Sequence, residues 1–182
     1  MRFIIFILLS LSSVLCYAIN HYGYMDKIQK KLDKQTPLCL GETQWPVSVK
    51  DGSSVWINAK MESLVDAGLV KSSIEGHNKV WFLTPLGSAE FKRSGDFCYG
   101  RIIVKNIESI THIDAKKGFI IFNYYIESLP EWAKNKSVRF AYSYLDNIVT
   151  GINVAKYRVE FEKVSSGVIE ITDEPTQLDL LY

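Results

Sequence analysis

The chain has 182 residues, of which 47% are hydrophobic, and carries 21 Lys and Arg against 20 Asp and Glu, for a formal net charge of +1. This hydrophobic fraction is enough for a packed core, and the length fits one large domain or two small ones. Because a nearly neutral chain has no long-range field to collect polyanions, nucleic acid and anionic membrane are disfavoured as obligate partners.

Residues 1–18 have the layout of a secretory signal peptide. A positively charged start is followed by a mostly apolar run, and Cys16 and Ala18 supply small residues before a cleavage site at Ile19. The run is barely long enough for a membrane anchor, and Leu15 fits poorly before a lipidated Cys16. We therefore expect a periplasmic or secreted protein with no stable membrane anchor after cleavage.

Two cysteines, Cys39 and Cys98, remain after the expected cleavage. An even pair in an oxidising compartment predicts one disulfide, with two separate buried thiols as the alternative. A bridge over a loop of this length stabilises a fold by on the order of 4 kcal/mol.

The first part of the mature chain, residues 19–95, has helical spacing of its apolar residues. Residues 26–35 predict a short helix. A second helix is predicted with Ser54 or Asn58 as its cap, and Gly68 lies where a left-handed C-terminal cap is expected.

A hairpin turn is predicted at residues 75–78, before a strand at 79–83. Thr84 is the expected cap of a third helix at 86–93, because Pro85 follows it at the first helical position.

Two stretches here carry a resemblance to a known fold. Residues 64–70 read Leu-Val-Asp-Ala-Gly-Leu-Val, and residues 80–87 read Val-Trp-Phe-Leu-Thr-Pro-Leu-Gly. A helix ending in Ala-Gly-Leu and a strand ending in Leu-Thr-x-x-Gly recur in winged-helix domains, so residues 58–91 resemble that fold. DNA binding is not expected, because the helix carries one lysine against two acidic residues.

The second part, residues 96–182, has the alternation typical of an antiparallel β-sheet. Residues 119–127 are apolar on both faces, as in a central strand. A capping box at Ser128 and Glu131 predicts a short helix at 129–135. The fold class is therefore α+β, with an N-terminal winged-helix-like part followed by an antiparallel β-sheet part. The predicted strands are 99–107, 119–127, 138–145, 157–163 and 168–172.

Two short stretches of the second part are similar to a group of uncharacterised exported bacterial proteins. They are residues 97–100, Phe-Cys-Tyr-Gly, and residues 129–133, Leu-Pro-Glu-Trp-Ala. Some members are associated with carbapenem biosynthesis and self-resistance clusters. The resemblance implies an exported accessory protein without enzymatic activity.

No catalytic, cofactor-binding or metal-binding residue is predicted. No serine lies in a Gly-x-Ser-x-Gly elbow, and the three histidines are dispersed. His112 and Asp114 fall on one face of a strand, which is either a weak metal signal or the polar end of a hairpin.

Aromatic residues make up 13% of the chain. Because exposed Tyr and Trp favour recognition, we consider Trp132, Tyr142 and Tyr144 as a partner surface, with burial in the core as the alternative.

These observations predict an exported, non-enzymatic binding or accessory protein without a cofactor. Its partner is expected to be a protein or a small ligand of the cell envelope, and antibiotic self-protection or inhibition of an envelope enzyme would fit. The alternative is an envelope hydrolase whose site is built from dispersed residues. Neither the ligand nor the oligomeric state follows from the sequence.

Overall fold

The computed structural model describes residues 23–50, 52–164 and 168–178. It contains both helices and strands, which confirms the α+β class. The predicted signal peptide, residues 1–18, lies outside the described residues. The chain forms two compact units that are interleaved in sequence, so that the predicted parts 19–95 and 96–182 both contribute to each. Unit 1 is formed within Met1–Gln35, Ile102–Tyr125 and Ile152–Tyr182, and unit 2 within Thr36–Arg101 and Ile126–Gly151.

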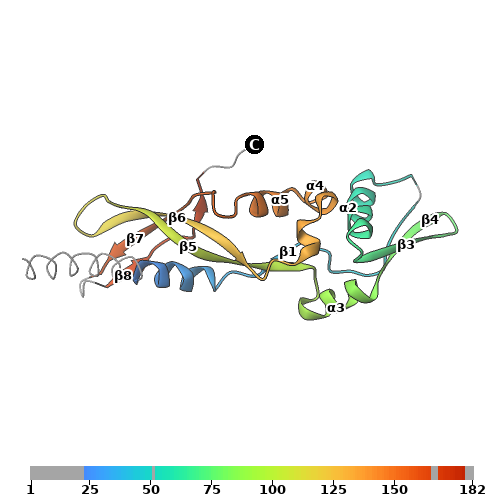
Figure 1. Cartoon of the computed structure of the whole chain (residues 1–182), viewed down its shortest axis with the longest axis horizontal. Coiled ribbons are helices and arrows are strands. Elements are labelled where there is room, and N and C mark those ends of the chain that lie inside the picture. The colour runs from blue at the N-terminus through green and yellow to red at the C-terminus, as the bar shows by residue number, and fades with distance from the viewer. Residues whose placement is uncertain (1–22, 51, 165–167, 179–182) are drawn as a thin grey trace, which may run out of the picture. The chain divides into compact units, whose positions relative to one another are not determined.

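Unit 1 is a sheet with a helix at residues 23–32 (Figure 1). The sheet order is β1-β5-β6-β7-β8, and β9 pairs with β7. The central position of β6 confirms the prediction for residues 119–127. Strand β1 and the outer ends of β5 and β6 belong to unit 2. The strands are β5 (Cys98–His112), β6 (Lys117–Glu127), β7 (Tyr157–Lys163), β8 (Ile169–Ile171) and β9 (Thr176–Gln177).

The core of unit 1 follows the alternation of the strands. In β7, Tyr157, Val159 and Phe161 are buried while the residues between them are more exposed, as the sequence predicts. Tyr24 of the helix meets Phe161 edge to face, with the ring centroids 5.3 Å apart. Gly118 is required beside them, because an added Cβ would come within 2.6 Å of the Phe161 ring.

Gln29 joins the helix to strand β5 through its side-chain amide. Its Oε1 accepts a hydrogen bond from the N–H of Val104 at 2.9 Å, and its Nε2 donates to the carbonyl of Ile102 at 3.3 Å. One side chain thus satisfies two backbone groups as a neighbouring strand would.

Unit 2 contains a second antiparallel sheet, of order β2-β4-β3. The predicted turn at residues 75–78 is confirmed, because Gly76 and His77 connect β3 to β4. The elements of unit 2 are β1 (Leu38–Cys39), β2 (Val47–Lys50), α2 (Val55–Asp66), β3 (Val70–Glu75), β4 (Asn78–Leu83), α3 (Pro85–Ser94), the 3₁₀ helix η1 (Glu131–Lys134), α4 (Lys136–Ala141) and α5 (Ser143–Thr150).

The helix ends of unit 2 confirm two of the predicted caps, at Thr84 and at Gly68. The Thr84 side chain accepts a hydrogen bond from the N–H of Gly87 at 3.0 Å, and Pro85 begins α3. Gly68 follows α2 with a φ of +74°, as a left-handed cap requires. Ser54 precedes α2 but makes no side-chain cap, and the Asn58 side chain instead donates to the carbonyl of Ser54 at 3.2 Å.

The predicted capping box is wrong, although a short helix is present. Ser128 has a φ of +59° and lies before Pro130, which precedes η1 without a side-chain cap. Pro130 holds the extended backbone that leads into the helix, so Ser128 cannot reach its first N–H groups.

The strand predicted at residues 138–145 is also wrong, because this segment forms α4 and α5. The Asn135 side chain caps α4 by accepting from the N–H of Ser137 at 2.8 Å. The buried residues Val138, Leu145 and Ile148 are spaced as on a helix rather than a strand.

The Cys39–Cys98 disulfide is confirmed. It spans 59 positions and joins residues that lie opposite each other in the β1–β5 pair. In the part of the chain that the structure describes, no helix is long and apolar enough to span a bilayer.

Candidate functional site

The three residues considered as a partner surface all lie in unit 2, with different exposure. Trp132 is 7% exposed and packs edge to face against Phe97 and Tyr99, at centroid distances of 6.0 and 6.4 Å. Tyr142 is 6% exposed, whereas Tyr144 is 62% exposed. Of the three, only Tyr144 presents its ring to solvent, and Trp132 is the buried anchor of η1.

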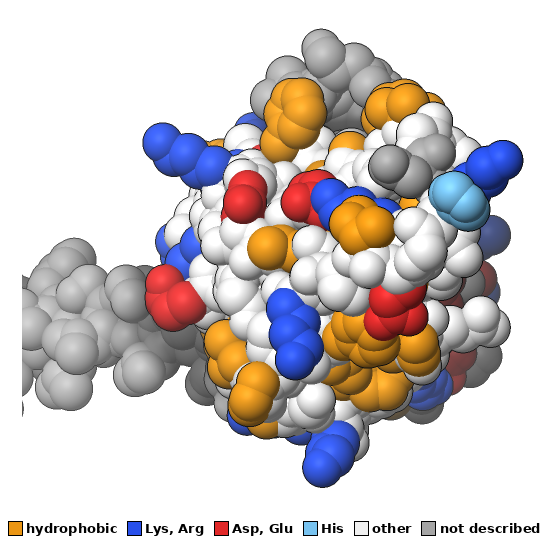
Figure 2. Space-filling model, turned by 90° about the vertical axis from the view of Figure 1, so that its right-hand side faces the viewer, with side chains coloured by type: hydrophobic (Ala, Val, Ile, Leu, Met, Phe, Trp, Pro, Cys, Tyr) orange, Lys and Arg blue, Asp and Glu red, His pale blue; other side chains and the backbone are white. Residues whose placement is uncertain are grey.

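Two other aromatic residues of unit 2 are far more exposed. Phe140 at the end of α4 is 94% exposed, and Trp56 at the start of α2 is 83% exposed. Figure 2, which views the chain from the side of α2, β3 and β4, shows hydrophobic side chains gathered in patches between charged ones. The sequence did not indicate Phe140 as a site residue, because residues 138–145 were predicted as a strand and form α4 and α5 instead.

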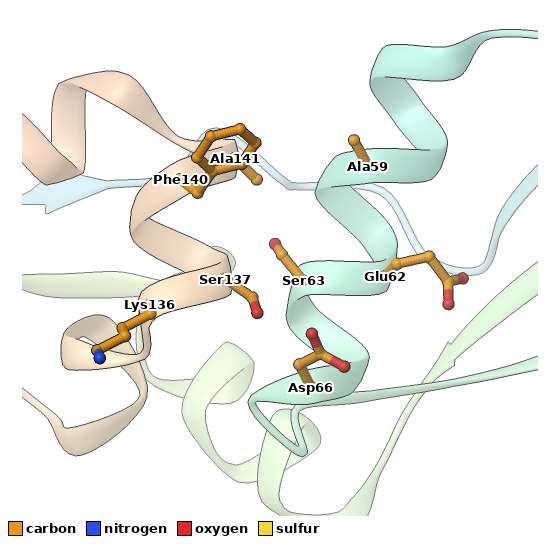
Figure 3. Close-up of a pocket in the computed structure, with 8 residues that line it drawn as sticks. All are labelled: Ala59, Glu62, Ser63, Asp66, Lys136, Ser137, Phe140 and Ala141. Carbon is orange, nitrogen blue, oxygen red and sulfur yellow. The ribbon is translucent and has the colours of Figure 1, made fainter.

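Helices α2 and α4 border a groove of about 420 Å³ (Figure 3). We call it the α2–α4 groove. The side chains of Ser63 and Ser137 point toward the space between the helices, the Asp66 carboxylate lies at the last turn of α2, and Phe140 lies at the end of the groove opposite Ala59. The groove is lined by Ala59, Glu62, Ser63, Asp66, Lys136, Ser137, Phe140 and Ala141.

Of the charged residues that line the groove, Glu62 has an ion-pair partner, whereas Asp66 and Lys136 have none among the described residues. Glu62 is held by Lys79 Nζ and by the indole N–H of Trp81, both at 2.8 Å from Oε1. Among the described residues, neither Asp66 nor Lys136 has an ion-pair partner. Their charges are therefore free to meet a ligand or the solvent.

A smaller pocket, of about 200 Å³, adjoins the groove at Ala141. We call it the Tyr142 pocket. The Tyr142 hydroxyl donates to Glu42 Oε1 at 3.1 Å, and Lys60 Nζ lies 3.4 Å from the same oxygen and 5.0 Å from the Tyr142 ring centre. The pocket is lined by Cys39, Leu40, Lys60, Tyr99, Ala141, Tyr142, Ser143, Tyr144 and Leu145.

The Tyr142 hydroxyl is kept protonated by its surroundings. Burial raises its pKa well above the ordinary range, and the negative charge of Glu42, the hydrogen bond to it and the charge of Asp96 add to the effect. Tyr142 therefore serves as a neutral hydrogen-bond donor rather than as a phenolate.

Asp96 fixes the loop that carries Glu42. Its carboxylate accepts hydrogen bonds from the N–H groups of Gly41 at 2.8 Å, Glu42 at 3.0 Å and Phe97 at 2.6 Å. Because Asp96 is buried, these bonds compensate the desolvation of its charge. The position of Glu42 beside Lys60 and Tyr142 depends on them.

His112 and Asp114 lie at the turn between β5 and β6, in unit 1. The Asp114 carboxylate accepts from the N–H groups of Lys116 and Lys117, both at 2.7 Å, and these bonds lower its pKa. The His112 ring packs against Phe161 at 5.5 Å between centroids. The two residues therefore form the end of a hairpin, and neither lines the α2–α4 groove or the Tyr142 pocket.

Within residues 23–50, 52–164 and 168–178, no group of three or more His, Cys, Asp or Glu side chains is placed to hold a metal ion. Comparisons with protein-family models, with curated proteins and with solved structures gave no significant match to this chain. The site therefore has to be interpreted from its own geometry.

Proposed function

We propose that this chain is an exported, non-enzymatic accessory protein that binds another protein of the cell envelope through the helical face of unit 2. The observation that carries the proposal is the exposure of Phe140 and Trp56 beside a groove between two helices. Large aromatic side chains dominate the binding energy of protein interfaces, and leaving them in water is unfavourable.

The exposed aromatic residues lie at or near the two adjoining cavities of unit 2. Phe140 lines the α2–α4 groove, Tyr144 lines the Tyr142 pocket, and Ala141 lines both. Trp56 lies one helical turn before Ala59 and Lys60, which line the groove and the pocket respectively. This arrangement supports a continuous recognition surface on α2, α4 and α5.

Two features support export. Residues 1–18 have the pattern of a signal peptide, and the Cys39–Cys98 disulfide is typical of oxidising compartments. Roles in antibiotic self-protection or in inhibition of an envelope enzyme remain proposals of the same kind. An intact mass that matches a chain beginning near Ile19, measured on protein from the envelope fraction, would support export, and a full-length mass in the cytoplasm would contradict it.

We also propose that residues 58–91 belong to a winged-helix-like arrangement. The sheet order β2-β4-β3, the β3–β4 hairpin and the start of α3 at Thr84 support it. Between β2 and β3 the described chain has the single helix α2, without the second helix of a helix–turn–helix. This difference, together with Glu62 and Asp66 on α2, favours a protein partner over DNA.

The binding proposal is tested with purified mature chain as bait in envelope extract. The variants Phe140→Ser and Trp56→Ser should lose the captured partner, whereas Ile74→Ser, which alters an exposed apolar residue on β3, should keep it. All variants should retain their circular dichroism spectrum and melting temperature, because the altered side chains are exposed. Equal capture by all of the variants would contradict the proposal.

A further inference from the structure

The α2–α4 groove has two chemically different ends (Figure 3). At one end lie Phe140, Ala141 and Ala59, which present only carbon to an occupant. At the other end the Ser137 hydroxyl points into the groove, and the exposed Asp66 carboxylate lies at its border. An occupant therefore has to match an apolar end and an acidic end at the same time.

Asp66 is the charge that the groove presents. Glu62 is neutralised by Lys79, and its side chain points to the other side of α2. The Lys136 side chain points away from α2 (Figure 3). A cation in the groove would thus meet Asp66 without a competing ammonium group beside it.

The position of Asp66 in its helix also favours a cation. It is the last residue of α2, whose final turn contains no basic residue. The C-terminal end of a helix carries a partial negative charge, so a carboxylate there is unfavourable until a positive group compensates it. Asp66 and the C-terminus of α2 thus make this side of the groove negative, opposed by the N-terminus of the short helix α4, which begins with Lys136.

The floor of the groove leaves room for side chains of an occupant. It is formed by small residues of both helices, among them Ala59, Ser63, Ser137 and Ala141. Phe140 stands beside it almost completely uncovered. Filling this space with apolar atoms would cover the ring and remove it from water.

We infer that the α2–α4 groove binds a protein segment in which an apolar residue and a lysine or arginine project from the same side, with the cation at Asp66 and the apolar residue at Phe140 and Ala59. This inference rests on the proposed function and names the chemistry of the partner. Ala59 and Asp66 are two helical turns apart, about 10 Å along the axis. The two groups of the partner are therefore spaced about seven residues apart in a helix, or about two to four in an extended strand, where only an even separation keeps both on the same side.

The test uses three fluorescein-labelled helical peptides of equal length and the purified mature chain, with binding followed by fluorescence polarisation. The first peptide carries leucines and, seven positions away on the same face, lysines. The second replaces the lysines by glutamates, and the third replaces the leucines by serines. Only the first should bind, and its affinity should fall as salt is raised, because partly exposed ion pairs are screened.

Two pairs of variants separate charge from apolar contact. Asp66→Asn should weaken binding of the leucine–lysine peptide about 5- to 10-fold, a difference typical of one ion pair at an interface. Glu75→Gln removes an exposed carboxylate on β3 and should leave the affinity unchanged. Phe140→Ser should abolish binding, and Ile74→Ser should not.

The outcomes distinguish the inference from the proposed function. If Phe140→Ser abolishes peptide binding while Asp66→Asn has no effect, or if the leucine–glutamate peptide binds as well as the lysine peptide, the charge inference is overturned and the binding surface stands. If no peptide binds and Phe140→Ser also leaves partner capture from envelope extract unchanged, the inference and the proposed function both fail.

Discussion

The two units of this chain differ in how far they bury their large aromatic side chains. In unit 1 the helix at residues 23–32 and strands β6 and β7 bury most of their aromatic rings, as Tyr24 and Phe161 are buried against each other, whereas Tyr125 is exposed. In unit 2 the aromatic rings of Trp56 on α2 and Phe140 on α4 face solvent. The difference indicates that unit 1 is organised around its core, whereas unit 2 combines a core with a surface available for recognition.

The polar side chains of the units show the same contrast. In unit 1 they satisfy backbone groups, as Gln29 does for β5 and as Asp173 does by accepting from the N–H of Glu160 at 2.7 Å. In unit 2, Glu42, Lys60 and Tyr142 interact with one another beside a pocket. Unit 2 has backbone contacts of this kind too, as Asp96 and Asn135 show, and in addition a group of polar side chains that shapes an accessible cavity.

The largest expected effect tests whether unit 2 also has an indispensable core. Trp132→Ala should lower the free energy of unfolding by about 3–5 kcal/mol, because it leaves a cavity between Phe97 and Tyr99. Phe140→Ala should change it by less than about 0.5 kcal/mol, because that ring is exposed. Urea denaturation measures both free energies of unfolding. Equal losses for the two variants would contradict the assignment of Trp132 to the core and of Phe140 to the surface.

Removal of the disulfide should destabilise unit 2 more than unit 1, because both cysteines belong to unit 2. Cys39→Ala should cost about 3 kcal/mol through the greater freedom of the unfolded chain. Hydrogen exchange read by mass spectrometry should accelerate in β1 and in the Cys98 end of β5 more than in β6 and β7. Uniform acceleration across the four strands would show that the units unfold as one.

The next effect depends on pH and concerns Tyr142. Tyr142→Phe should cost about 1.5 kcal/mol at pH 8, through loss of the hydrogen bond to the Glu42 carboxylate. Because the folded state raises the pKa of this hydroxyl, its contribution is complete below about pH 10, where an unfolded tyrosine titrates, and is lost as the pH rises further. At pH 11 the difference between wild type and variant should therefore shrink by about 1.4 kcal/mol.

Tyr144→Phe is the matched control, since Tyr144 is exposed. It should leave the urea midpoint unchanged at both pH values. A difference between wild type and Tyr142→Phe that stays constant from pH 8 to pH 11 would contradict the assigned role of Tyr142.

The smallest effect tests the polar contacts of unit 1. Gln29→Ala should cost about 1 kcal/mol, because the N–H of Val104 and the carbonyl of Ile102 lose their partner. Lys30→Ala alters an exposed neighbour on the same helix and should have less than half that effect. Thermal unfolding followed by circular dichroism compares the two, and a larger loss for Lys30→Ala would contradict the role given to Gln29.

The sequence predicted the strands of unit 1 well and the last helices of unit 2 poorly. The alternation in residues 157–163 is strict, and its period of two identifies a strand. In residues 136–150 the aromatic and β-branched residues favour a strand by composition, and α4 and α5 are too short, at six and eight residues, for the helical period to dominate. The three-residue spacing of Leu145 and Ile148 in α5 was the one helical signal in this segment, and it covers a single turn.

The candidate site could not be predicted from the sequence for a different reason. Asp66 and Asn135, 69 positions apart, are brought together by a side-chain hydrogen bond between the ends of α2 and α4. No local pattern specifies such a pairing, because it depends on tertiary packing. Cys39 and Cys98 were the exception, since an even number of cysteines after the expected cleavage was sufficient to pair them.

The contact of Gln29 with β5 has a consequence for how the chain avoids self-association. A strand edge with free N–H and carbonyl groups is a template on which another chain can add a strand, and edges of this kind promote aggregation. The amide of Gln29 occupies that template at Ile102 and Val104, 73 and 75 positions further along the chain. During folding, this edge stays open until the helix at residues 23–32 has docked, so partly folded chains would be most prone to add a strand at Ile102 and Val104 in that interval.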